Sequence, residues 1–203
     1  MAARACGFGE RDRRVIDPPP IVQLILPPNS DPEELRYPFN VVHCTLFSPD
    51  GKTDETALTN SDKRLTRRLM GTLVSSPFVG NDENGSEGSF FCFPDLSCRT
   101  PGKHRLRFAL MRLEPSDLKP QGFTPIITEV LSEVFTVYTA KEFPGMRPST
   151  RLTIALKGQG CAISVKKGNE KAVAGGKDEA GDSADEGDSP YSGNGKSKRR
   201  RKT

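Results

Sequence analysis

Short apolar segments separated by proline- and glycine-rich turns run along most of this chain. Each segment is about five to eleven residues long and rich in β-branched or aromatic side chains, which favours strands over helices. Turn signals such as Ser48-Pro49-Asp50-Gly51 follow the segments. We therefore predict about eight strands, over residues 21–26, 39–47, 69–74, 89–93, 103–113, 134–139, 152–156 and 161–165.

This spacing of short strands predicts an all-β protein, an immunoglobulin-like β-sandwich with little helix. Within 103–113, Leu106, Phe108 and Leu110 alternate with polar residues, so they should share the buried face. Residues 125–131 could hold one or two helical turns. The first 14 residues mix glycine with arginine and are expected to form an arm or loop.

The composition changes after residue 165 and predicts a domain over 1–165 and a disordered tail over 166–203. Gly, Asp, Glu, Ser and Lys dominate the tail, and too few apolar residues remain to offset the entropy of ordering. An acidic block, 178–188, precedes the basic run KSKRRRK. Such a run suits a nuclear import receptor, and the alternative is a solubilising tail. The predicted nuclear localisation signal comprises Lys196, Lys198, Arg199, Arg200, Arg201 and Lys202.

Motifs for membrane insertion, secretion or catalysis do not stand out. No run of about 18 apolar residues exists, and the N-terminus lacks the apolar stretch of a secretory signal, so we expect an intracellular protein without a membrane partner. The five cysteines form no C-x-x-C motif, and Cys44 and Cys92 are interpreted as core residues. His43 is interpreted as a packed side chain, and His104 lies in a basic stretch. We therefore predict no enzyme, no cofactor and no metal site.

Arginines and lysines are clustered, although the domain is almost neutral. Residues 1–165 carry 20 Lys and Arg against 19 Asp and Glu. Three stretches are basic: the first 14 residues, residues 63–68, and a longer stretch over 99–112. Arginine suits phosphate and guanine because its planar fork donates paired hydrogen bonds, whereas the alternative is ordinary solvated charge. The candidate DNA-binding residues are Arg4, Arg11, Arg13 and Arg14 in the arm and Lys63, Arg64, Arg67 and Arg68 in the second cluster.

Several long ordered segments resemble the velvet family of fungal regulators. The N-terminal match runs from Arg4 to Arg14 (RACGFGERDRR) and continues as IDPPPIVQL from Ile16. FFCFPDL, GKHRLRF and FPGM also match, and the resemblance covers about residues 4–165. Within the family, the uninterrupted domain is most similar to the branch of spore-viability regulators, with the velvet C branch as the near competitor.

The resemblance implies a sandwich like the Rel-homology domain that presents loops to double-stranded DNA. In that arrangement Arg4, Cys6 and Gly7 match the arginine, cysteine and glycine of a Rel recognition loop. It also implies a nuclear transcription regulator of fungal development, sporulation and secondary metabolism that forms homodimers, or heterodimers with another velvet protein. The alternative is an interaction scaffold that does not bind DNA.

Overall fold

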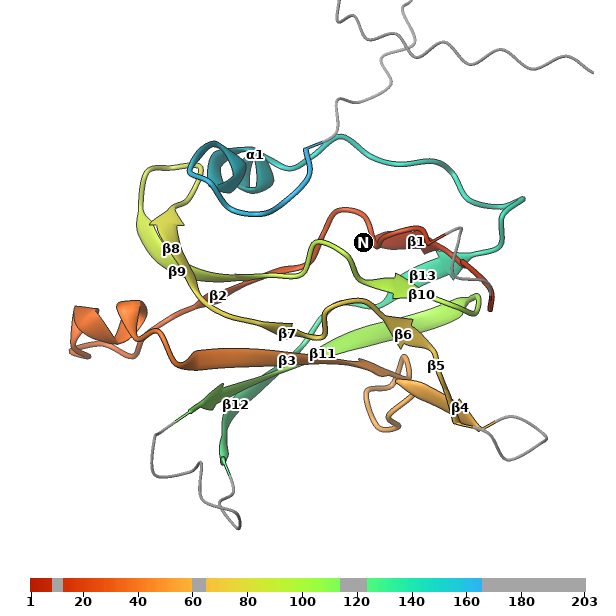
Figure 1. Ribbon diagram of the computed structural model, residues 1–203, viewed down its shortest axis with the longest axis horizontal. Helices are drawn as coiled ribbons and strands as arrows, with labels where there is room; N and C mark the ends of the chain where they lie inside the picture. Colours follow the sequence, from red (N-terminus) through yellow and green to blue (C-terminus); the bar gives the residue numbers. More distant parts are fainter. Residues whose placement is uncertain (9–12, 60–64, 114–123, 166–203) are drawn as a thin grey trace, which may run out of the picture. The chain divides into compact units, whose positions relative to one another are not determined.

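The computed structural model describes residues 1–8, 13–59, 65–113 and 124–165, and these form a curled arrangement of β-sheets with one α-helix (Figure 1). The all-β class predicted above is confirmed. The longer elements are β3 (Asn40–Phe47), β9 (Glu87–Cys92), β11 (Gly102–Arg112), β12 (Ile126–Leu131) and α1 (Arg151–Gly158). The shorter ones are β1 (Ala2–Arg4), β2 (Ile21–Leu24), the 3-10 helix η1 (Pro32–Arg36), β4 (Ala57–Thr59), β5 (Leu65–Arg67), β6 (Leu69–Met70), β7 (Val74–Ser75), β8 (Phe78–Asn81), β10 (Ser97–Cys98) and β13 (Phe135–Tyr138).

The larger sheet is built around β11. Its strand order is β1-β13-β11-β3-β7, and β12 also pairs with β11. β3 and β11 are antiparallel, with Leu106 opposite Leu46 and Phe108 opposite Cys44. These side chains are buried, as the alternation along β11 predicted, because successive side chains of a strand point to opposite faces.

A second sheet, β2-β9-β8, provides the opposite wall of the core. Phe91 and Phe93 are buried there, and the Phe93 ring lies 5.3 Å from that of Phe108 across the core. Two small two-stranded sheets, β10-β6 and β4-β5, lie together with β1 and β13 at one end of the domain (Figure 1). The described residues of the first two predicted basic clusters lie at this end.

The C-terminal part of the domain corrects two strand predictions. Residues 152–156 belong to the helix α1, whose N-cap Thr150 accepts a hydrogen bond from the Thr153 backbone at 3.1 Å. A five-residue apolar run fits a helix face as well as a strand, and here the cap decides. Residues 161–165 form no strand, although Cys161 and Ile163 are buried beside Leu156. No helix among the described residues is long and apolar enough to cross a membrane.

Three other segments also differ from expectation. Residues 125–131 form the strand β12 instead of helical turns, because pairing with β11 suits the β-branched sequence IITEVL. Residues 69–74 divide into β6 and β7, which join different sheets. The start of the expected N-terminal arm is the strand β1, which pairs in parallel with β13 and buries Ala2 and Ala3. The predicted tail over 166–203 lies outside the described residues.

Candidate nucleic-acid interface

The N-terminal strand ends in a short loop that is fixed to the rest of the domain. The Cys6 backbone donates a hydrogen bond to the Cys98 carbonyl at 3.0 Å, and the Gly7 backbone donates to the Arg99 carbonyl at 3.0 Å. The Arg99 side chain returns a hydrogen bond to the Gly7 carbonyl at 3.3 Å. Gly7 has a φ of +64°, a conformation that glycine adopts readily, so the chain can turn outward at this point.

The two predicted basic clusters meet through Arg99. The Arg99 backbone N–H donates a hydrogen bond to the Arg68 carbonyl at 3.0 Å, while its carbonyl accepts from Gly7. Pairing of β10 with β6 continues this contact, with Cys98 opposite Leu69. Segments about 60 residues apart in the sequence therefore lie side by side, and Arg99 lies between them.

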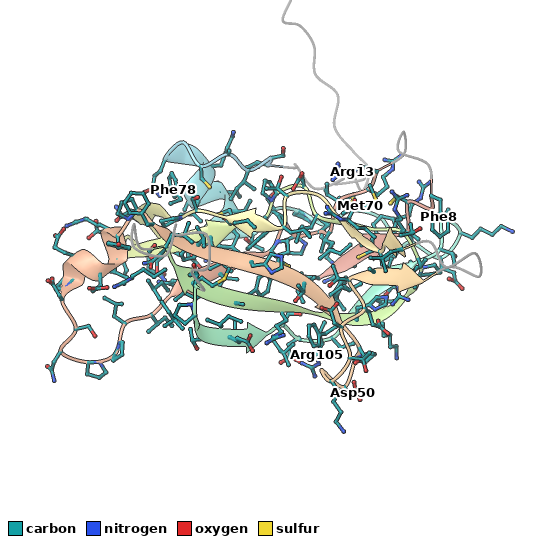
Figure 2. The ribbon with its side chains drawn as sticks, turned by 60° about the horizontal axis from the view of Figure 1, so that its bottom comes forward. Phe8, Arg13, Asp50, Met70, Phe78 and Arg105 are labelled. Carbon is teal, nitrogen blue, oxygen red and sulfur yellow. The ribbon has the colours of Figure 1, made fainter. Side chains whose placement is uncertain are left out.

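Arg13 resumes the described chain close to this junction. Its guanidinium donates to the Asp95 carbonyl at 2.8 Å and to the Ser97 hydroxyl at 3.3 Å, and it lies 3.7 Å from the Asp95 carboxylate. About a third of the side chain remains exposed. In Figure 2, Arg13 and Phe8 lie toward the same end of the molecule, far from Phe78. Arg14 is exposed as well.

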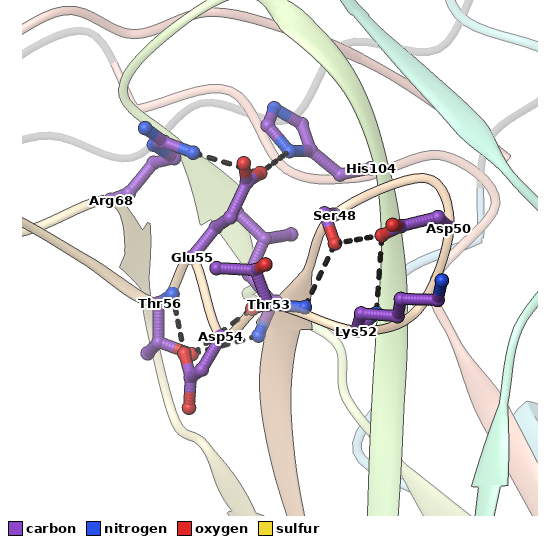
Figure 3. Close-up of polar contacts among 10 residues, drawn as sticks. Ser48, Asp50, Lys52, Thr53, Asp54, Glu55, Thr56, Arg68 and His104 are labelled. Carbon is purple, nitrogen blue, oxygen red and sulfur yellow. Dashed lines mark hydrogen bonds and ion pairs between the residues drawn. The ribbon is translucent and has the colours of Figure 1, made fainter.

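Glu55 connects β11 to the segment that precedes β6. Its carboxylate accepts from Arg68 at 2.9 Å and from Nδ1 of His104 at 2.6 Å (Figure 3). His104 is buried, and among the described residues its Nε2 atom has no hydrogen-bond partner. Burial lowers the pKa of His104, which outweighs the opposing effect of Glu55, so the ring is neutral at pH 7.

The predicted DNA-binding residues therefore differ in their placement. Arg67 is exposed in β5, whereas Arg4 is partly buried in β1 and Arg68 is directed toward Glu55. Their contact with DNA stays a prediction. Arg11, Lys63 and Arg64 lie outside the described residues, as does the whole predicted nuclear localisation signal.

The structure adds Arg99 to the candidate DNA-binding residues. The other arginines of the third basic stretch have separate contacts. Arg105 donates to the Pro49 and Ser132 carbonyls, whereas Arg107 and Arg112 form ion pairs with Glu129 and Glu34, respectively. These arginines are therefore spread along β11 and do not gather at one site. The sequence signal for Arg99 was its place at the start of the third basic stretch, but its hydrogen bond with Arg68 could not be seen from one segment alone.

This arrangement defines an all-β sandwich domain with an arginine-rich end. Comparison with known proteins then identifies its family: residues 1–64 and 52–170 match the family described as Velvet factor. The chain belongs to the velvet family, and the resemblance noted in the sequence is confirmed.

Relatives from both predicted branches are found. The chain is 58% identical over 176 residues to the sexual development regulator VELC of Pyricularia oryzae, covering 84% of this chain and 40% of that protein. It is 50% identical over 190 residues to the spore development regulator vosA of Beauveria bassiana, covering 91% of this chain and 69% of that protein. It is 36% identical over 160 residues to a velvet complex subunit of Chaetomium globosum, covering 77% of this chain and 34% of that protein. The chain thus spans about two fifths of the length of VELC.

Proposed function

We propose that this chain binds double-stranded DNA in a sequence-specific way through the arginine-rich end, and regulates fungal development as part of a velvet dimer. The observation that carries the proposal is the meeting of two basic clusters at Arg99. Separate solvated charges have no reason to gather at one end of an almost neutral domain, whereas a phosphate backbone attracts such a cluster. The names of the relatives support the developmental role.

The exposed arginines and the interior arginines have different roles in this proposal. Arg13, Arg14 and Arg67 can reach phosphate oxygens or base edges, and Arg99 lies between their segments. Arg68, held by Glu55, positions the β5–β6 segment. Arg4, within β1, fixes the start of the loop. Contacts to phosphate set the register on the duplex, and contacts to bases give the specificity.

Selection from a randomised duplex library tests the DNA-binding proposal. The purified 203-residue chain is incubated with the library at two salt concentrations, and the retained duplexes are sequenced. We expect one enriched motif whose enrichment survives at the higher salt concentration, because base contacts do not depend on counterion release. Retention of all sequences alike would contradict sequence-specific binding and favour the scaffold alternative.

A second part of the proposal concerns the partner. β12 and the end of β2 expose apolar side chains beside a groove with a volume of about 710 Å³ that reaches core residues Phe91 and Phe108. An exposed apolar surface of this kind is typical of protein contacts. The Chaetomium relative is named as part of a velvet complex. We propose that a second velvet domain covers this apolar surface, which comprises the exposed groove residues Ile25, Val130 and Leu131.

Light scattering tests this assignment. Replacing Ile25 and Val130, which both line the groove, with Lys should lower the measured mass from dimer to monomer, since two charges would be buried without partners. Ile154→Lys provides a control, because Ile154 is similarly exposed but lies on α1. A parent chain that is monomeric alone and dimeric with another velvet protein would indicate a heterodimer. An unchanged dimer in the double variant would place the interface elsewhere.

Nuclear import is the third part of the proposal and rests on the KSKRRRK sequence. Replacing Lys198, Arg199, Arg200 and Arg201 with Ala should disperse a fluorescent fusion into the cytoplasm, because import receptors bind compact basic runs. A control fusion replaces the separated lysines Lys166, Lys167, Lys171 and Lys177, which removes the same charge. Equal nuclear accumulation of both variants would contradict the localisation signal, provided that no velvet partner is co-expressed.

A further inference from the structure

Phe8 is an exposed aromatic side chain at the arginine-rich end. Its exposed fraction is 61%, although phenylalanine is usually buried. Figure 2 shows Phe8 at the end of the molecule where Arg13 also lies. The guanidinium of Arg99 lies over the Phe8 ring, 5.8 Å from its centroid. An exposed aromatic ring and a partly buried guanidinium, which also donates to the Gly7 carbonyl, are thus adjacent.

The chain that leads into Phe8 is held by hydrogen bonds to the segment Cys98–Arg99. Cys6 and Gly7 are hydrogen-bonded through their backbones to Cys98 and Arg99, and the Cys6 thiol lies 3.2 Å from the Cys98 carbonyl oxygen. A side chain on an ordered base loses little conformational entropy when it binds, and phenylalanine has only two rotatable side-chain bonds. The exposed ring is therefore ready to make an apolar contact.

We propose that Phe8 and Arg99 read adjacent bases in the major groove, with Phe8 contacting the C5-methyl group of a thymine and Arg99 a guanine. This inference rests on the proposed DNA binding and names the bases that it recognises. The thymine methyl is the apolar group that the major groove presents, and phenylalanine is suited to contact it. Guanine presents two acceptors, N7 and O6, which match the fork of an arginine.

The contact has a signature that separates it from phosphate binding. Phe8 is uncharged, so its removal should weaken binding without changing the slope of affinity against salt concentration. Removal of a phosphate-binding arginine should reduce that slope by about one. The duplex selected from the library is used with the parent chain, Phe8→Ala and Phe8→Trp. Phe39→Ala is the matched control, because Phe39 is 53% exposed but lies between η1 and β3.

Each thymine of the selected duplex is then replaced by uracil, which removes only the methyl group. We expect Phe8→Ala to bind about tenfold more weakly at an unchanged salt slope, with Phe8→Trp recovering part of the loss and Phe39→Ala binding like the parent. One uracil substitution should weaken duplex binding by the parent but not by Phe8→Ala. This is the non-additivity expected if that thymine and Phe8 contact each other. This thymine should neighbour a guanine.

Two results would overturn the proposal while leaving the proposed function intact. One is a folded Phe8→Ala variant that binds the selected duplex like the parent chain. The other is a weakened variant that stays as sensitive as the parent to every uracil substitution, which would make Phe8 a structural residue. Failure of the parent chain to select any duplex would instead overturn the DNA-binding function itself, and the Phe8 contact with it.

Discussion

At the residue scale, the arginine-rich end depends on carboxylates that hold its basic side chains in place. Glu55 holds Arg68 and His104, and Asp95 holds Arg13. Such buried or half-buried contacts set where the exposed arginines lie. A buried polar group left without its partner is costly, so these contacts are open to mutational tests.

The buried His104 should make stability depend on pH. Because its pKa is lowered in the folded protein, the unfolded chain binds more protons below the ordinary value of 6.5. Its contribution to folding is therefore fully present above pH 6.5 and declines as the pH falls toward the lower folded pKa. Urea unfolding of the parent and His104→Gln at several pH values measures this. The parent should lose more stability than the variant on acidification, and parallel curves would contradict the assignment.

Gly71 should be required for the close approach of Asp95. It has a φ of +111°, and a Cβ atom there would lie 2.5 Å from the Asp95 carbonyl oxygen, which binds Arg13. Gly145 is the matched control, with a φ of +101° and no neighbour within 4 Å of a Cβ. Gly145→Ala should cost about 1–2 kcal/mol from backbone strain. Gly71→Ala should cost roughly 1–3 kcal/mol more from overpacking, as measured by urea unfolding. Equal losses would rule out the steric argument.

At the element scale, the sequence-based prediction was accurate where the strand signal was clear. β3, β9 and β11 were placed within one or two residues. Alternation marked β11, whereas β-branched and aromatic residues next to turns or polar loops marked β3 and β9. β12 and α1 were assigned the wrong way round. Their apolar runs are too short to distinguish the helical period of 3.6 residues from the strand period of two. Pairing with β11 makes β12 a strand, and the Thr150 cap makes α1 a helix.

The Thr150 cap gives a direct test of what determines α1. Thr150→Ala removes the hydroxyl that accepts from the Thr153 backbone and should cost about 1 kcal/mol in the free energy of unfolding. Ser164→Ala, at an exposed position without helical structure, should change stability little. Chemical denaturation of both variants provides the measurement. A Thr150→Ala variant as stable as the parent would show that tertiary packing of Leu156 alone fixes the helix.

At the scale of the whole molecule, the sequence predicted which residue types form the site but not which of them meet. Clusters around Arg13 and Arg67 could be found from composition. Their convergence depends on hydrogen bonds between Gly7, Arg99 and Arg68, which belong to three distant segments. The parallel pairing of β1 with β13 could not be predicted either, because a three-residue strand carries no periodic signal.

The most direct test of the account compares two triple variants that each lose three exposed positive charges. Arg13, Arg14 and Arg67 are replaced with Ala in one, and Arg36, Arg151 and Lys157 in the other. Binding to the selected duplex is measured by fluorescence anisotropy at several salt concentrations. The first variant should bind at least tenfold more weakly, with a salt slope reduced by about two to three, because phosphate contacts are lost. The second should bind nearly like the parent. Equal losses in both variants would show that net charge alone attracts DNA, and would contradict a binding surface at the arginine-rich end.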